Sequence, residues 1–340
     1  MKTQVLSGYQ PIKGLKFLAF VSLGFVLLYL AFKDQDLSEV FNQLKSANYF
    51  WAIPVFVVSL FSHIIRTIRW QMLMKPLGYR PGIKNSLYAL MCGYLVNYAV
   101  PRLGEVTRCA LLNKTNNVPF KPLFGTVVTE RAIDILCLLI LIFIVTLMEF
   151  STISGYCYEI IFLPLYSHFL STLPGITTIL ILGLLSSIML FAVFLIFKNR
   201  IKTSPVFKRI IQFLQQIWIG IASVAKVEKK WLFITITITI WVTYLLTTYL
   251  WFFAFEETKG LTLGAGLFFM VMGSIGKSLP IQGGGMGAYH YLITQAVLLY
   301  GVGEVYGNAL SIVVHGFQTA FYLVLGGISF FIISLKKQTI

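Results

Sequence analysis

Long apolar runs dominate the chain, and their length predicts helices that span a membrane. The runs are continuous and do not alternate with polar residues, which favours α-helices and excludes an outer-membrane barrel. A helix of about 20 apolar residues crosses a hydrocarbon core of about 30 Å. Runs near that length cover Phe17–Phe32, Trp51–Ile65 extended through Trp70, Leu123–Met148, Ile176–Phe197, Trp231–Phe255 and Val305–Leu335. The pattern predicts an all-α polytopic membrane protein with about six full transmembrane helices.

Two further apolar segments, Lys84–Leu112 and Leu261–Val302, are interrupted by prolines, glycines and charges. The loops on both sides of the first segment are cationic, and those on both sides of the second are acidic. Each segment should therefore return to the side from which it enters. Non-helical backbone at membrane depth is tolerated where it is buried in protein or lines a wet cavity, so we expect two opposed re-entrant hairpins. The alternative is that each segment makes two ordinary crossings, for eight spans in all.

The order span, hairpin, span occurs twice, in residues 49–148 and residues 231–335. The first copy begins outside and the second begins inside, which predicts an inverted-topology repeat with binding near the membrane midplane. We expect one integral membrane domain over residues 1–340, with residues 198–230 as a cytoplasmic amphipathic connector. Residues 36–48 should form a short amphipathic helix on the outer surface.

Composition and charge support a membrane protein and argue against a nucleic-acid partner. The chain is 57% hydrophobic and 11% charged, with a mean hydropathy of +0.82 and a net charge of +15. The basic residues gather in loops on one side, so the positive-inside rule places both termini in the cytoplasm, and we expect a multi-pass protein of the bacterial cytoplasmic (inner) membrane. We assign to the loop after the second span the basic residues Arg66, Arg69, Lys75, Arg80 and Lys84. The spacing of the cysteines and histidines predicts no metal and no cofactor.

Charges cluster at the first interrupted segment and at the start of the next span. Arg102, Glu105 and Arg108 are spaced by three and share one helix face, and Glu130, Arg131 and Asp134 follow on the next span. Charges inside a bilayer are costly, which favours a functional use. The arginines would bind a phosphate, and the carboxylates would balance the empty site or carry a proton. The alternative is a set of structural salt bridges that lock the hairpin to its neighbour, with Arg108 at the water interface.

The second interrupted segment carries Lys277 ahead of a proline and a glycine run, with one histidine a turn later. Glycine-rich turns present free N–H groups, so an anion could bind there with Lys277 as its counter-charge. The alternative for the glycines is close helix packing, and for the histidine a hydrogen bond to a neighbour. A nucleotide P-loop is excluded because Val271 stands where its first glycine should be. The predicted substrate contacts here are Lys277, Gly284, Gly285, Gly287 and His290.

These motifs together resemble a known family. The run Pro101-Arg-Leu-Gly-Glu105 with Arg108, then Glu130-Arg131 and Asp134, then Pro280 and Gly284-Gly-Met-Gly287 resemble the membrane region of the lysylphosphatidylglycerol synthases and their stand-alone flippase-like relatives. The resemblance covers roughly residues 15–335. It implies a lipid translocase without the soluble synthase domain, and not an enzyme. Members of the family often have a glutamate where this chain has His290, which puts a carboxylate role at that position in doubt.

The sequence thus predicts a flippase-like protein that moves an anionic phospholipid or lipid-linked headgroup between leaflets. An intramembrane enzyme acting on a lipid phosphate, a small-solute transporter and a scaffold without transport are the alternatives. The pattern leaves the oligomeric state open, a homo-oligomer included.

Overall fold

A computed structural model of the protein describes residues 37–157 and 227–335, together with Tyr29, residues 183–186, Met189 and Gln215. Each element in this part of the chain is a helix. The chain divides into two compact units, one made of residues 1–127 and 224–340 and the other of residues 128–223. Two predicted spans, Phe17–Phe32 and Ile176–Phe197, lie largely outside the described residues, as does most of the 198–230 connector.

Four helical segments in the described part are long and apolar enough to cross a membrane. They are Tyr49–Leu77 with 29 residues, Phe120–Met148 with 29, Lys230–Ala254 with 25 and Glu304–Leu335 with 32. Their cores are α3 (Ala52–Met74), α6 (Phe120–Met148), α11 (Lys230–Leu250) and α15 (Glu304–Leu335). At about 1.5 Å per residue, each segment exceeds the roughly 30 Å of a hydrocarbon core. Four of the six predicted spans are therefore confirmed as long apolar helices.

The two interrupted segments form helical hairpins with short arms. The first consists of α4 (Ile83–Ala99) packed against α5 (Leu103–Asn116). The second consists of α12 (Leu263–Ser278) packed against α14 (Ala288–Leu299), with the turn α13 (Gln282–Gly285) between them. At about 1.5 Å per residue the four arms measure about 18 to 26 Å, which is shorter than a hydrocarbon core.

Close backbone contact between its arms shapes the first hairpin. Val100 is extended, as the residue before a proline prefers, and ends α4. The side-chain oxygen of Asn97 then accepts a hydrogen bond from the Gly104 N–H at 2.7 Å, which satisfies a donor in the first turn of α5. A Cβ atom on Gly104 would overlap the carbonyl oxygen of Gly93. Only glycine lets the two arms cross at this distance.

The glycine run shapes the second hairpin. Leu279 is extended before Pro280 and ends α12. Gly283, Gly284, Gly285 and Gly287 all have positive φ angles, between 64° and 87°. L-residues adopt this left-handed region rarely, so the turn requires glycine for its backbone conformation.

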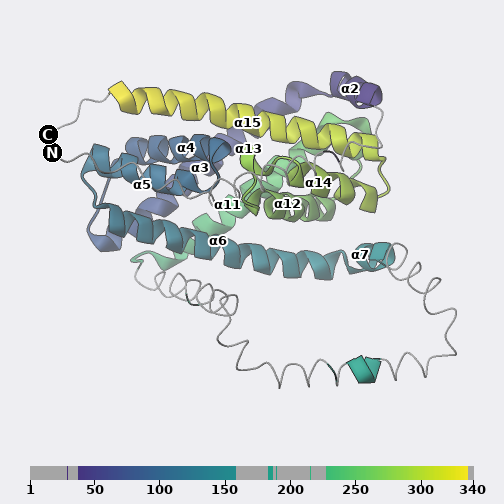
Figure 1. The fold of residues 1–340 in the computed structure, drawn as a ribbon, viewed down its shortest axis with the longest axis horizontal. Coiled ribbons are helices and arrows are strands. Elements are labelled where there is room, and N and C mark those ends of the chain that lie inside the picture. The colour runs from purple at the N-terminus through teal and green to yellow at the C-terminus, as the bar shows by residue number, and fades with distance from the viewer. Residues whose placement is uncertain are drawn as a thin grey trace, which may run out of the picture. The chain divides into compact units, whose positions relative to one another are not determined.

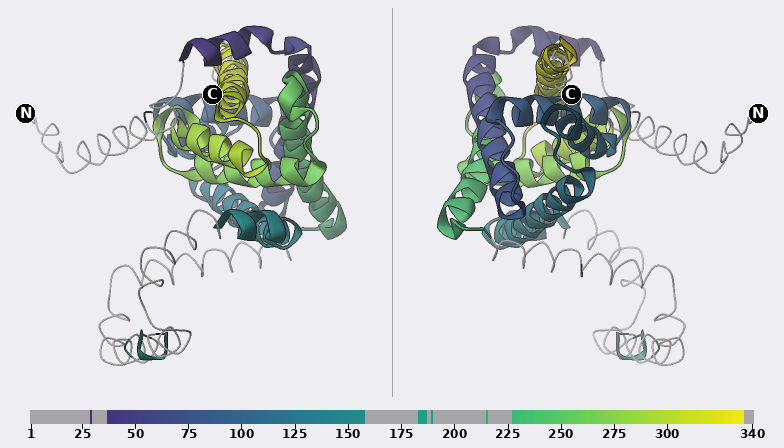
Figure 2. Two further views of the ribbon diagram at one scale, coloured as in Figure 1. Left: turned by 90° about the vertical axis from the view of Figure 1, so that its right-hand side faces the viewer. Right: turned by 90° about the vertical axis from the view of Figure 1, so that its left-hand side faces the viewer.

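Within the first unit, α15 packs along α4 and α14 and so touches both hairpins (Figure 1). α3 packs along α11, which Figure 2 shows as a purple helix beside a green one. The turns of the two hairpins also meet, because the Gln282 side-chain amide donates to the Ala99 carbonyl at 3.4 Å. Residues 183 positions apart in sequence therefore lie together at the hairpin turns.

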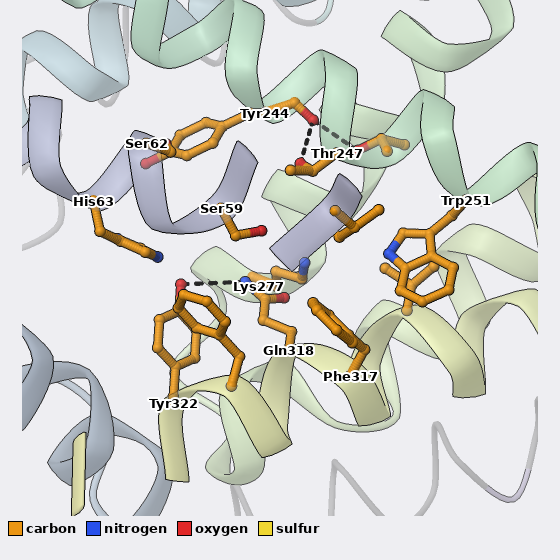
Figure 3. A pocket seen from close by; sticks show the side chains of 14 residues that line it. Ser59, Ser62, His63, Tyr244, Thr247, Trp251, Lys277, Phe317, Gln318 and Tyr322 are labelled. Atoms are coloured by element: carbon orange, nitrogen blue, oxygen red, sulfur yellow. Dashed lines mark hydrogen bonds between the residues drawn. The ribbon is translucent and has the colours of Figure 1, made fainter. Parts of the chain in front are cut away.

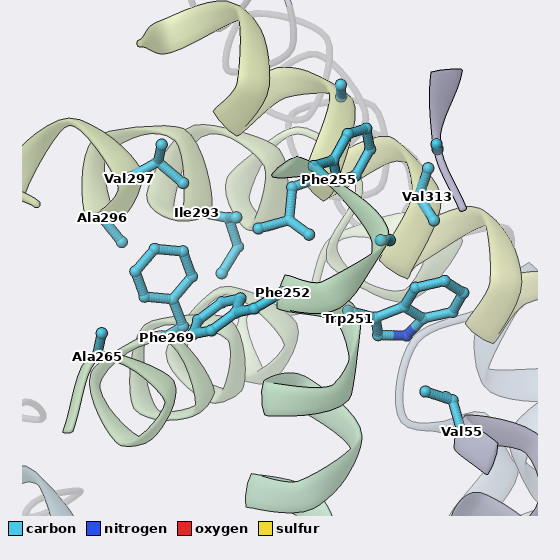
Figure 4. Close-up of a cluster of buried hydrophobic side chains, with 14 of the residues drawn as sticks. Val55, Trp251, Phe252, Phe255, Ala265, Phe269, Ile293, Ala296, Val297 and Val313 are labelled. Carbon is cyan, nitrogen blue, oxygen red and sulfur yellow. The ribbon is translucent and has the colours of Figure 1, made fainter. Parts of the chain in front are cut away.

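A hydrophobic cluster holds the second hairpin in place. Trp251 and Phe252 of η5 (Trp251–Ala254) pack with Phe269 of α12 and Ile293 of α14 (Figure 4). The rings of Phe252 and Phe269 lie edge to face with their centroids 5.0 Å apart. Val313 of α15 belongs to the same cluster. Burial of these side chains holds α12 and α14 against α15 and against η5, which follows α11.

Contacts at the helix ends show that α3 and α11 run antiparallel. Lys75, after α3, forms a salt bridge with Glu228, before α11, and this hydrogen bond lowers the pKa of the Glu228 carboxyl. At the opposite ends of the same helices, the Asn48 N–H donates to the Ala254 carbonyl at 2.8 Å. The predicted amphipathic helix at residues 36–48 is confirmed as α2 (Leu37–Ser46), which packs on α15.

Candidate functional site

A polar cavity of about 80 Å³ lies in the first unit, between α3, α11, α15 and the end of α12 (Figure 3). Among the described residues that line it, Lys277 is the one with a full charge. The rest of the lining is partly apolar and partly polar. Its polar members are Ser59, Ser62, His63, Tyr244, Thr247, Thr248, Gln318 and Tyr322.

Lys277 lies in the last turn of α12, where the helix dipole favours a cation. Its ammonium stands over the Tyr289 ring, 4.3 Å from the centroid. The backbone around it is tightly packed, because a Cβ on Gly285 would lie 2.9 Å from the Lys277 Cα. The turn that follows α12 therefore fixes where this charge can sit.

Tyrosine and threonine side chains form a hydrogen-bonded wall on the α11 side of the cavity. The hydroxyls of Thr247 and Thr248 donate to the backbone carbonyl of Tyr244 at 2.9 and 3.0 Å. The Tyr244 hydroxyl accepts a hydrogen bond from Arg66 Nη1 at 2.6 Å. The hydroxyl protons of Thr247 and Thr248 are therefore engaged within α11 and do not point to a ligand.

Several polar atoms on the α3 and α15 side have unused hydrogen-bonding capacity among the described residues. His63 is 4% exposed, and its Nδ1 is buried without a hydrogen-bond partner. Gln318 Nε2 donates to the Tyr322 hydroxyl at 3.4 Å, while Gln318 Oε1 is buried without a partner. Buried polar groups are almost always paired, so such atoms mark a place where a ligand or solvent belongs.

The charged residues of the first hairpin lie in different environments. Arg102 is exposed at the turn, with a φ of +67°, and occupies the N-cap position of α5 without a capping hydrogen bond from its side chain. Glu105 is half-buried. Arg108 is 2% exposed, with its guanidinium 4.6 Å from the Trp70 ring centroid. The structural alternative, in which Arg108 stands at the water interface, is therefore wrong, because the side chain is buried against the Trp70 ring.

The prediction that Arg66 and Arg69 belong to a cytoplasmic loop is also wrong. α3 continues through both residues to Met74, and they are 4% and 0% exposed. The helix extends past the end of the apolar run because packing inside the unit, including the bond from Arg66 to Tyr244, accommodates the two side chains. Two arginines that the sequence analysis assigned to a loop are therefore buried in a helix.

Glu130, Arg131 and Asp134 lie on α6, in the part of that helix that belongs to the second unit. Glu130 is fully buried, and the other two are half-buried. Their role in phosphate binding stays a prediction.

The residues of the glycine run and His290 have packing roles. A Cβ on Gly284 would lie 2.9 Å from the Tyr98 ring, and one on Gly285 would lie 2.7 Å from the Gly276 carbonyl oxygen. The Gly287 N–H donates to His290 Nδ1 at 3.3 Å. His315 donates from Nε2 to the Gly283 carbonyl at 2.8 Å, and its ring centroid lies 4.9 Å from that of His290. Anion binding by the run itself stays a prediction.

The comparisons with known proteins identify the family. The chain matches the lysylphosphatidylglycerol synthase TM region over residues 17–326. It belongs to this family. The chain is also 28% identical, over 144 residues, to a UPF0104 membrane protein from Methanocaldococcus jannaschii, a match that covers 42% of each chain. No solved structure matches the chain. Family membership and the four long apolar helices together show a multi-pass membrane protein.

Of the residues that line the cavity, the sequence analysis predicted Lys277 as a substrate contact and missed the others. Ser59, Ser62 and His63 follow the spacing i, i+3, i+4 on α3. Tyr244, Thr247 and Thr248 repeat that spacing on α11. Side chains with this spacing share one helix face, so a polar stripe inside each apolar run was the available signal.

Proposed function

We propose that the protein is a flippase-like translocase that moves an anionic phospholipid or lipid-linked headgroup between the leaflets of the bacterial cytoplasmic membrane, and that it is not an enzyme. The polar cavity beside Lys277, inside a bundle of apolar helices, carries this proposal. Ionisable residues within membrane segments mark substrate paths by default. Membership of the family named for the membrane region of a lipid synthase supports a role in handling membrane lipid.

The helix order supports the transporter part of the proposal. α3, the α4–α5 hairpin and α6 follow one another in residues 49–148, and α11, the α12–α14 hairpin and α15 follow in residues 231–335. The short arms suit re-entrant hairpins, whose turns would stop inside the bilayer. Opposed hairpins that meet at their turns resemble the plan of inverted-repeat transporters, which bind substrate near the midplane.

In this proposal Lys277 binds the phosphate of the headgroup in the cavity, and Arg102, Arg108 and Arg131, which do not line that cavity, contact the phosphate elsewhere on its path. Guanidinium groups match phosphate oxygens in pairs, which favours arginine for this task. Glu105, Glu130, Asp134 and His290 set the charge of the site when no lipid is bound. The acyl chains stay in the bilayer while the headgroup crosses.

A small-anion transporter is the second candidate, and the size of the cavity favours it. A volume of about 80 Å³ accommodates one anionic group and not a whole glycerophosphate headgroup. Under the lipid proposal, the remainder of the headgroup lies outside this cavity.

Mass spectrometry of co-purified lipids tests the lipid proposal. We expect the wild-type protein to enrich one anionic lipid over the bulk membrane, and the single variants Arg102→Ala and Arg131→Ala to lose part of that enrichment because each removes a phosphate contact. The double variant Arg80→Ala, Lys84→Ala is the control, since both side chains are exposed beyond the bundle. Equal lipid profiles for the wild type and the bulk membrane would favour the small-anion candidate.

A further inference from the structure

We propose that the cavity beside Lys277 binds a single oxyanion, a phosphate or a carboxylate, through the Lys277 ammonium and hydroxyl donors on α3 and α15. The inference rests on the proposed function for its lipid ligand and deepens it by naming the residues that hold the anion. Three observations carry it: the charge of the lining, the free donors and the volume of the cavity.

The first observation is a positive charge without a negative one beside it. Lys277 is the one fully charged side chain among the described residues that line the cavity. The Tyr289 ring attracts the ammonium but carries no net charge. A charge removed from water is stable only when it is paired or neutralised. A bound oxyanion supplies that pairing.

The second observation is that the lining holds donors with free hydrogen-bonding capacity. The Tyr322 hydroxyl accepts from Gln318 Nε2 at 3.4 Å, which leaves its own proton for a ligand. His63 Nδ1 can donate in one of the two neutral tautomers. Figure 3 shows Ser59, His63 and Tyr322 turned toward the space beside Lys277.

The third observation is size. A cavity of about 80 Å³ holds a group of a few non-hydrogen atoms, since an engineered cavity of about 150 Å³ holds benzene. A tetrahedral phosphate or a carboxylate fits such a space. Both the phosphate of a lipid headgroup and a free anion have this chemistry.

Calorimetric titration of the purified full-length protein in a neutral detergent tests the site. The three probes are dihexanoyl phosphatidylglycerol, dihexanoylglycerol, which has the same chains without phosphate, and inorganic phosphate. We expect Lys277→Met to weaken binding of the phosphate-bearing probe at least tenfold and Lys277→Arg to retain most of it. Lys259→Met is the matched control, because Lys259 is an outer-loop lysine paired with Glu256, and this variant should bind as the wild type does.

The pattern of probe binding separates the sources of the anion. Binding of the phospholipid alone assigns the site to a headgroup, and binding of inorganic phosphate assigns it to free anions as well. Equal binding of dihexanoylglycerol and the phospholipid would overturn the proposal, as would unchanged binding by Lys277→Met. If the protein binds phosphate through Lys277 but moves no lipid, the proposed anion site stands and the proposed translocase function is contradicted.

Thermal unfolding distinguishes a binding lysine from a structural one. If Lys277 serves a ligand, its replacement by methionine leaves the midpoint of the ligand-free protein unchanged or higher, because an uncompensated, half-buried charge is removed. If Lys277 only stabilises the end of α12, the midpoint falls and the titrations stay unchanged. That second result would contradict the proposal.

Discussion

Replacing Gly104 with alanine should destabilise the protein by more than about 3 kcal/mol, because the added methyl group forces the two arms of the first hairpin apart. Its Cβ would overlap the Gly93 carbonyl oxygen and lie 2.7 Å from the Asn97 amide carbon. Both neighbours are constrained, since Gly93 contributes backbone and Asn97 caps α5. The expected result is a lower midpoint of thermal unfolding and a smaller monodisperse fraction in gel filtration.

Gly125→Ala is the control for this prediction. Gly125 is a helical glycine of α6 with nothing within 4 Å of the position of its Cβ. Alanine is favoured over glycine in a helix by about 1 kcal/mol, so this variant should be as stable as the wild type or slightly more stable. If Gly104→Ala and Gly125→Ala unfold at the same midpoint, the close crossing of α4 and α5 is not formed in the folded protein.

Replacing Gly285 with alanine should cost a similar amount, for two reasons that a control can separate. The residue has a φ of +87°, which alone costs an L-residue about 1 kcal/mol. Its Cβ would also lie 2.7 Å from the Gly276 carbonyl oxygen and 2.9 Å from the Lys277 Cα. The second hairpin would have to open at the point that positions Lys277, so we expect a loss of more than about 3 kcal/mol.

Gly301→Ala isolates the backbone contribution, because Gly301 has a φ of +73° and open space around it. We expect that variant to lose about 1 kcal/mol of stability, so its midpoint of thermal unfolding should lie well above that of Gly285→Ala. Equal losses in the two variants would mean that backbone conformation alone explains the glycine run and that packing against α12 contributes nothing.

The sequence was sufficient to predict the long helices of the described residues, because their signals are local. The length of the apolar runs located the four long helices, and Pro101, Pro280 and the glycine run located the hairpin turns. One stretch departs from the continuous apolar pattern that predicted helices, because Ile234-Thr-Ile-Thr-Ile-Thr-Ile240 alternates as a strand does, yet it forms helix. The hydroxyls of Thr237 and Thr239 donate to carbonyls one turn earlier, which satisfies them in an apolar surrounding.

The cavity could not be assembled from sequence, because its walls come from four separate helices. The polar stripes on α3 and α11 were readable as stripes, but the contact between the two helices joins residues about 180 positions apart. The same limit hid the pairing of His290 with His315. Arg66 and Arg69 were misassigned for a different reason, since the apolar run ends before the helix does.

Lipid translocation in liposomes tests the central claim most directly. The purified protein is reconstituted with a fluorescent phosphatidylglycerol or an equally labelled neutral lipid, with and without a proton gradient, and a membrane-impermeant quencher follows exchange between leaflets. We predict faster exchange of the anionic lipid than in protein-free liposomes, and little change for the neutral lipid. Exchange of the anionic lipid at the protein-free rate under both conditions would contradict the claim that the protein is a translocase of anionic lipids.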